Sequence, residues 1–156
     1  MDAPSLFSDK ELAFLASLVE GEVSFLVVGL AAAALQGAPA VTQDVDLWFH
    51  DLADPRLTRA LQRIGASYIP PTHSTPPLLA GAGTDLFDIV VHMHGLESFD
   101  QEVRRATLVQ VGGINVPVLP LERIIVSKRA SGRPKDLSIL PALEDALRAR
   151  GADKRD

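Results

Sequence analysis

Two aspartates, Asp44 and Asp46, stand two residues apart in residues 44–49, which read DVDLWF. This segment is predicted to be a β-strand. Because strand side chains alternate between two faces, both carboxylates point to the same side, roughly 6.5–7 Å apart along the strand. Carboxylates so placed can converge on divalent cations, which take oxygen ligands and often keep water and phosphate in the remaining positions. A structural alternative is that Asp44 caps a turn while Asp46 is a solvated residue of a half-exposed strand.

The elements that precede the pair favour the chemical interpretation. Residues 25–28, FLVV, are a short apolar run that predicts a buried strand, and Gly29 breaks it. Residues 31–36 contain good helix formers, and this helix is expected to end at Gly37 and Pro39. Since a helix N-terminus is a natural phosphate site, a phosphate-bearing ligand suits this segment.

A third carboxylate lies in residues 85–92, DLFDIVVH, which are predicted to form a strand. The strand is apolar on both faces and is therefore expected in the centre of a sheet. Asp85 and Asp88 fall on opposite faces, so only one of them can point at the earlier pair. Asp85 sits at the strand start, where solvent or a turn can satisfy it. A carboxylate within the run is costly to bury without a metal or partner, so Asp88 is the candidate.

His92 and His94 share one strand face, a spacing that metal ligands can use. No third His or Cys lies at a supporting spacing, and Gly95 ends the strand at once. They are better interpreted as strand-end histidines near solvent, with His92 on the Asp88 face.

A basic segment follows near the C-terminus. Residues 121–132, LERIIVSKRASG, predict a helix in which Lys128 aligns with the apolar stripe of Leu121, Ile124 and Ile125. A lysine in that position either extends to water or meets a negative partner. The last helix is expected to begin near Pro134. From spacing alone the segment could also be a solvated basic turn.

The order of these residues resembles the nucleotidyltransferase superfamily with the DNA polymerase beta-like fold, in particular its small stand-alone bacterial members. Those proteins carry a Gly-Ser or Gly-Gly turn, a short helix, often Gly-x-x-Arg-x-Thr, then Asp-x-Asp. A third acidic residue before two aliphatic residues and a Lys…Gly-Arg-x-Lys-Asp segment complete their pattern. The resemblance spans about residues 24–147, and the matching positions are Gly29, Gln36, Gly37, Thr42, Asp44, Asp46, Asp88-Ile89-Val90, Lys128 and Gly132-Arg133-Pro134-Lys135-Asp136.

The resemblance implies an α+β fold in one domain, residues 1–156: a mixed β-sheet with helices packed on one side and a C-terminal helical segment. It also implies Mg²⁺-dependent transfer of a nucleoside monophosphate from an NTP, with ATP the first choice, to an acceptor hydroxyl. Its implied metal ligands and catalytic residues are Asp44, Asp46 and Asp88, with Asp88 helping to deprotonate the acceptor. The turn at Gly29 and Leu30 would cradle phosphate, and Lys128 or Lys135 would offset its charge.

Two positions depart from the family pattern and keep an alternative open. Leu30 replaces the second residue of the Gly-Ser turn, and Ala40 replaces the usual arginine. The alternative is a catalytically degenerate nucleotidyltransferase fold that binds a nucleotide or a partner, including a toxin–antitoxin partner. The acceptor could be RNA, protein or a small molecule, a homodimer is open, and an unrelated α/β domain is a further alternative.

The composition limits the possible domain number, metal sites, location and partners of the protein. A chain of 156 residues with 47% hydrophobic residues suits one domain with a real core. The absence of cysteine excludes disulfides and thiolate metal sites. The N-terminal residues lack a secretory signal pattern, and no apolar run reaches membrane-spanning length, so a soluble cytoplasmic protein that makes no membrane contact is expected. A net charge of −5 argues against a broad nucleic-acid surface without excluding a local basic site.

Local signals predict the surrounding elements. Ser8 and Glu11 form a capping box at the start of a helix, and Asp54 with Pro55 starts another. Residues 69–84 contain so many prolines and glycines that a long loop is expected. Two strands joined by Gly112-Gly113 predict a β-hairpin, in which Pro117 places the second strand at the sheet edge.

Overall fold

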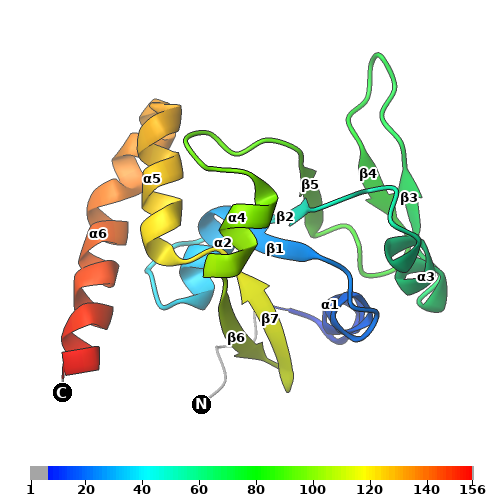
Figure 1. Cartoon of the computed structure of the whole chain (residues 1–156), viewed down its shortest axis with the longest axis horizontal. Helices are drawn as coiled ribbons and strands as arrows, with labels where there is room; N and C mark the ends of the chain where they lie inside the picture. The colour runs from blue at the N-terminus through cyan, green and yellow to red at the C-terminus, as the bar shows by residue number, and fades with distance from the viewer. Residues whose placement is uncertain (1–6, 156) are drawn as a thin grey trace.

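The computed structural model describes residues 7–155, with side chains described for residues 7–151. Its main sheet contains β1 Phe25–Val28, β2 Val45–Phe49, β5 Phe87–Val90, β6 Thr107–Val111 and β7 Ile114–Val118 (Figure 1). The strand order is β5-β2-β1-β7-β6. The β1/β2 and β6/β7 pairs are antiparallel, whereas the β1/β7 and β2/β5 pairs are parallel. The α+β class and the mixed sheet are therefore confirmed.

Helices precede, connect and follow these strands within the described residues. They are α1 Asp9–Glu20, α2 Gly29–Leu35, α3 Pro55–Arg63, α4 Phe99–Glu102, the 3-10 helix η1 Val103–Arg105, α5 Leu121–Ser131 and α6 Pro134–Arg155. α6 is the C-terminal helical segment expected from the sequence, and it continues through Pro141. None of the helices in the described part of the chain combines the length and apolar character needed to cross a bilayer.

The helix boundaries follow the local signals. The Ser8 hydroxyl accepts a hydrogen bond from the Glu11 amide, and the Glu11 carboxylate accepts one from the Ser8 amide, which confirms the capping box. The Asp54 carboxylate accepts the Arg56 amide in front of α3, whose first residue is a proline.

Two aromatic contacts show which helices cover the faces of the sheet. Phe14 of α1 packs against Phe87 of β5, with ring centroids 4.6 Å apart. Phe99 of α4 packs edge-on against Trp48 of β2, with centroids 5.3 Å apart. Because Trp48 pairs with Val90, three residues beyond Phe87, the side chains of Phe87 and Trp48 point to opposite faces. Helices thus lie on both faces of the sheet, and not on the single side that the resemblance implied.

Strand pairing corrects two predicted positions in the sheet. β5 lies at an edge and not in the centre; its apolar residues are covered by packing such as that from α1 and not by a strand on each side. β7 lies inside the sheet, between β1 and β6, and not at the edge. Pro117 is tolerated there because pairing with β1 begins only at Val118, and the Leu119 amide donates to the Val27 carbonyl at 2.9 Å.

The segment 69–84 is not a continuous loop. β3 Ser67–Ile69 pairs with β4 Leu78–Ala80 as a separate two-stranded antiparallel sheet. The prolines that argued against a strand lie in the connection between the two strands. Figure 1 shows this hairpin extending away from the main sheet.

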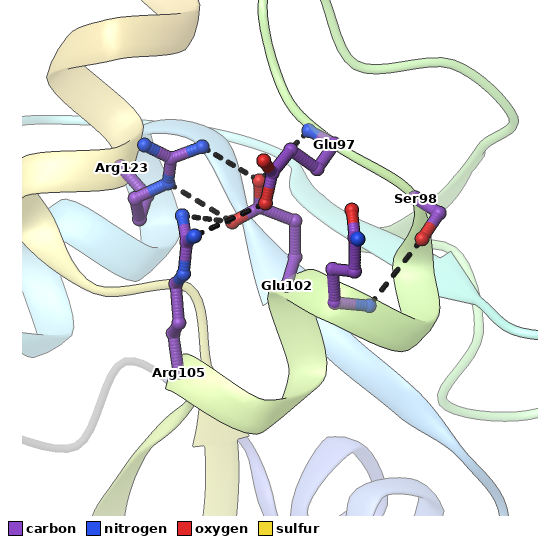
Figure 2. A network of polar contacts seen from close by, with 6 residues as sticks. Glu97, Ser98, Glu102, Arg105 and Arg123 are labelled. Atoms are coloured by element: carbon purple, nitrogen blue, oxygen red, sulfur yellow. Dashed lines mark hydrogen bonds and ion pairs between the residues drawn. The ribbon is translucent and has the colours of Figure 1, made fainter.

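A buried ion pair joins α4 and η1 to α5 (Figure 2). The Glu102 side chain is fully buried and accepts two hydrogen bonds from the Arg123 guanidinium, at 3.0 and 2.7 Å. The Glu97 amide donates to the same carboxylate at 2.8 Å. Burial alone would raise the pKa of Glu102, but these hydrogen bonds and the charges of Arg123 and Arg105 outweigh it and lower that pKa.

Candidate active site

Two of the predicted acidic residues lie side by side in the sheet. Asp46 of β2 and Asp88 of β5 are register partners in the parallel pair. Directly opposed residues on neighbouring strands project to the same face, so the two carboxylates share one side of the sheet. Asp46 is half-buried and Asp88 is exposed. Asp44 lies just before β2 in a turn where its amide donates to the Thr42 hydroxyl at 3.3 Å.

The three carboxylates influence one another electrostatically. Burial, then repulsion from Asp88 and Asp44, raises the pKa of Asp46, while the positive charge of Lys128 opposes this shift. Reduced solvation at the strand, then repulsion from Asp44, raises the pKa of Asp88. The ionised forms of Asp46 and Asp88 are therefore less favoured than those of free aspartates, and a positive charge beside them would offset this effect.

The oxygen atoms of these acidic side chains are suitable ligands for a hard divalent cation. Carboxylate oxygen is the ligand that Mg²⁺ prefers, and Mg²⁺ usually takes only one or two protein carboxylates together with water and substrate phosphates. Asp46 and Asp88 can supply these two. Across the described residues, no three His, Cys, Asp or Glu side chains form a set that could hold a metal ion, so Asp44 does not complete a three-residue set in this conformation.

Gly29 lies against Asp46. Its φ is +68°, a conformation that L side chains rarely adopt, and a Cβ placed on it would lie 3.1 Å from Asp46 Oδ2. The next residue, Leu30, is half-buried and lines a cavity together with Thr42 and Asp44. The strand-to-helix turn at Gly29 therefore lies directly against the Asp46 carboxylate, and its next residue, Leu30, presents an apolar side chain to the cavity that contains Asp44.

Lys128 lines the same cavities as Asp46 and is ion-paired with a second aspartate, Asp136. Its ammonium lies 3.0 Å from Asp136 Oδ1, and both side chains are largely buried, with 17% and 8% of their surface exposed. Lys135 is exposed and lines the cavity that also contains Leu30 and Asp44. Of the two predicted phosphate-contacting lysines, Lys135 is exposed to solvent whereas Lys128 is ion-paired.

Two adjoining cavities meet at these residues. One has a volume of about 270 Å³ and contains Gly29, His92 and His94, and the other has a volume of about 290 Å³ and contains Leu30 and Asp44. The residues that line both cavities are Asp46, Lys128, Arg133 and Asp136. These four form the wall between the cavities, which we call the dividing wall.

The structure also places residues in the first cavity to which the sequence interpretation gave no role. Ser127 and Ser131 of α5 line the first cavity together with Lys128. Their spacing of four residues on a helix, next to the lysine, was the available signal. His92 and His94 contact each other edge-on, with centroids 5.0 Å apart, and both are exposed. They line the first cavity without belonging to a metal-ligand set.

The mixed sheet and its helices form a nucleotidyltransferase-like fold. Comparison with solved structures supports this at low sequence identity. The antibiotic-resistance factor ANT(2″)-Ia in complex with adenylyl-2″-tobramycin is 17% identical, with a TM-score of 0.58 over 92% of this chain and 88% of that chain. A putative nucleotidyltransferase from Thermotoga maritima is 18% identical, with a TM-score of 0.57 over 93% and 97% of the two chains.

A third structure, an antigenic nucleotidyltransferase-like protein from Paracoccidioides brasiliensis, is 21% identical, with a TM-score of 0.54 over 90% of this chain and 78% of that chain. No protein-family model and no curated protein sequence matches the chain. The chain therefore has a nucleotidyltransferase-like fold, as the order of its motifs predicted.

Proposed function

We propose that this protein transfers a nucleoside monophosphate from an NTP, with ATP the first choice, to an acceptor hydroxyl in a Mg²⁺-dependent reaction. The observation that carries the proposal is the side-by-side placement of Asp46 and Asp88 on neighbouring strands, with Gly29 directly against Asp46. The fold supports it, because ANT(2″)-Ia shares this fold and was solved with an adenylylated small molecule. The proposal also places the protein in the cytoplasm, where NTPs are formed.

In this proposal Asp46 and Asp88 would hold Mg²⁺, and Asp44 would be the third carboxylate of the site. Bound Mg²⁺ would neutralise phosphate charge and stabilise the departing pyrophosphate. The acceptor oxygen forms a bond to the α-phosphorus, the bond between that phosphorus and the bridging oxygen to the β-phosphate breaks, and pyrophosphate leaves. Asp88, the exposed member of the pair, accepts the proton of the acceptor hydroxyl. The amides at Gly29 and the charges of Lys128 and Lys135 hold the phosphates.

A second candidate function is binding without turnover. Leu30 carries no hydroxyl donor and lines the cavity beside Asp44, and Ala40 lines a separate apolar cavity with Val41 and Leu86. Each missing polar group could cost about 10²–10³ in rate if it served the transition state. In that case the protein would hold a nucleotide or a partner, such as a toxin–antitoxin component, on the same face.

Thermal unfolding tests whether the site binds a metal and a nucleotide. We expect Mg²⁺ with one of the NTPs to raise the melting temperature of the wild type by about 5–10 °C at saturating ligand, because a ligand at 100 times its Kd stabilises by about 2.7 kcal/mol. Asp46→Asn should abolish the shift, whereas Asp85→Asn, which removes an exposed carboxylate in the turn before β5, should retain it. Absence of a shift with every NTP would contradict the proposal.

Label transfer separates the two candidate functions. The wild type and Asp46→Asn are incubated with each labelled NTP and a cell extract, and RNA, protein and small molecules are then separated. Transfer by the wild type alone supports the enzyme and identifies its acceptor. Thermal stabilisation by nucleotide without label in any fraction would instead support the binding protein.

A further inference from the structure

The turn between α5 and α6 contains a cluster centred on one buried carboxylate, which we call the Asp136 cluster. Asp136 accepts the Lys128 ammonium at 3.0 Å and the Arg133 guanidinium at 2.9 Å. The Ser131 hydroxyl lies 2.5 Å from its second oxygen. The cluster thus ties one residue of α6 to two residues of α5 and one of the connecting turn.

These partners stabilise the ionised form of the Asp136 carboxylate. Burial alone would raise the pKa of Asp136, but hydrogen bonds from Ser131, Lys128 and Arg133 outweigh it and lower that pKa to about 2. Two cations share one carboxylate, so the cluster carries one positive charge in excess. Arg133 is 70% exposed, which leaves part of that charge at the surface.

The location of the cluster points to a role beyond joining two helices. Lys128, Arg133 and Asp136 all belong to the dividing wall, so they border both cavities. Lys128 also acts on Asp46, because its positive charge opposes the rise in the pKa of that carboxyl group. The ammonium is therefore held by Asp136 while its charge also acts on Asp46.

We propose that Asp136 is a positioning residue for the polyphosphate of the substrate: it holds the Lys128 ammonium and the Arg133 guanidinium at the dividing wall, beside Asp46. This inference rests on the proposed function. Free lysine and arginine side chains lose rotamer freedom when they bind an anion, and a fixed partner removes part of that loss beforehand. Asp136 therefore acts through the two cations and need not contact the substrate itself.

The first test examines the lysine without any ligand. The chain has four lysines, so the Nζ resonances in a ¹⁵N NMR spectrum can be assigned with Lys128→Met. We expect an ordered, hydrogen-bonded ammonium signal for Lys128 that disappears in Asp136→Asn and is kept in Asp145→Asn. Asp145 is a matched control because it pairs with Arg148 on the exposed surface of the same helix. A solvent-averaged Lys128 signal in the wild type would overturn the proposal.

The second test measures the affinity for inorganic tripolyphosphate with Mg²⁺ in a thermodynamic cycle. Asp136→Asn should weaken binding about tenfold, as expected when a charge-assisted contact is misplaced, and Lys128→Met at least as much. In the Lys128→Met background, Asp136→Asn should have only a small further effect, which reflects Arg133. A purely structural role predicts the same loss in both backgrounds, and that result would overturn the inference.

Two further variants distinguish the loss of the charged contact from a general folding defect. Asp136→Glu should restore most of the affinity, because it keeps the charge, and Ser131→Ala should weaken binding by only two- to threefold, because a neutral hydroxyl is weaker than a charged partner. Normal tripolyphosphate binding by Asp136→Asn would overturn the inference while leaving the proposed function intact. If the wild type binds neither tripolyphosphate nor any NTP, the proposed function fails, and the inference fails with it.

Discussion

At Gly29 the backbone conformation and the position of a site carboxylate depend on the same atom, the missing Cβ. Replacing Gly29 with alanine should lower the free energy of unfolding by about 1–2 kcal/mol, because a non-glycine residue is strained at φ +68°. The new Cβ would also lie 3.1 Å from Asp46 Oδ2 and displace that carboxylate. We expect urea denaturation to show the loss of stability and Mg²⁺/NTP stabilisation to be weakened.

Gly65 offers a matched control for this substitution. Its φ is +69°, and a Cβ placed there would meet no atom within 4 Å. Gly65→Ala should therefore show the same backbone cost with no effect on ligand binding. Equal ligand binding by the two variants would mean that the contact between Gly29 and Asp46 has no functional consequence.

At the scale of elements, the Glu102–Arg123 pair connects α4 and η1 to α5, the helix that carries Lys128 (Figure 2). Glu102→Gln should lower the free energy of unfolding by about 2–4 kcal/mol, because it leaves Arg123, whose side chain is only 19% exposed, without a buried counter-charge. Urea denaturation measures this loss. The double variant Glu102→Gln/Arg123→Met should recover part of it.

The exposed part of the same network supplies the comparison. Glu97 pairs with Arg105 at 3.0 Å, and about half of each side chain is exposed. Glu97→Gln should therefore cost less than about 1 kcal/mol, as is usual for surface ion pairs. A loss as large as that of Glu102→Gln would show that burial of the carboxylate does not determine its contribution.

At the scale of the whole molecule, Asp136 should influence resistance to acid. Its pKa is lowered from 3.8 to about 2 in the folded protein, so the folded state favours the ionised carboxylate. The resulting stabilisation, about 2 kcal/mol, is complete above the unfolded value of 3.8 and is lost as the pH falls towards 2. Denaturation of the wild type and Asp136→Asn at pH 2, 3, 4 and 5 measures it.

The quantity to compare is the difference in unfolding free energy between the wild type and Asp136→Asn. We expect this difference to be about 2 kcal/mol larger at pH 5 than at pH 2. Asp145→Asn removes an exposed carboxylate from the same helix. Its unfolding free energy should change with pH in the same way as that of the wild type. A wild-type advantage over Asp136→Asn that does not change with pH would show that the carboxylate makes no ionisation-dependent contribution.

Most individual elements were predictable from the sequence because their signals are local. The capping box at Ser8, the Asp54-Pro55 helix start and the Gly112-Gly113 turn each depend on residues within one turn of chain. The hairpin of β3 and β4 was missed because its strands have three residues each and are separated by a proline-rich connection. Short strands give little periodicity to recognise.

By itself, the sequence determined the α+β class, the order of the elements and the spacing of Asp44, Asp46 and Asp88 along the chain. Tertiary structure decided which strands are neighbours: it placed β5 at the edge and set Asp46 beside Asp88. It also decided that Lys128 is paired with Asp136 between two cavities. The physical reason is that capping and turn signals act over a few residues, whereas strand neighbours and buried ion pairs depend on packing between segments far apart in the chain.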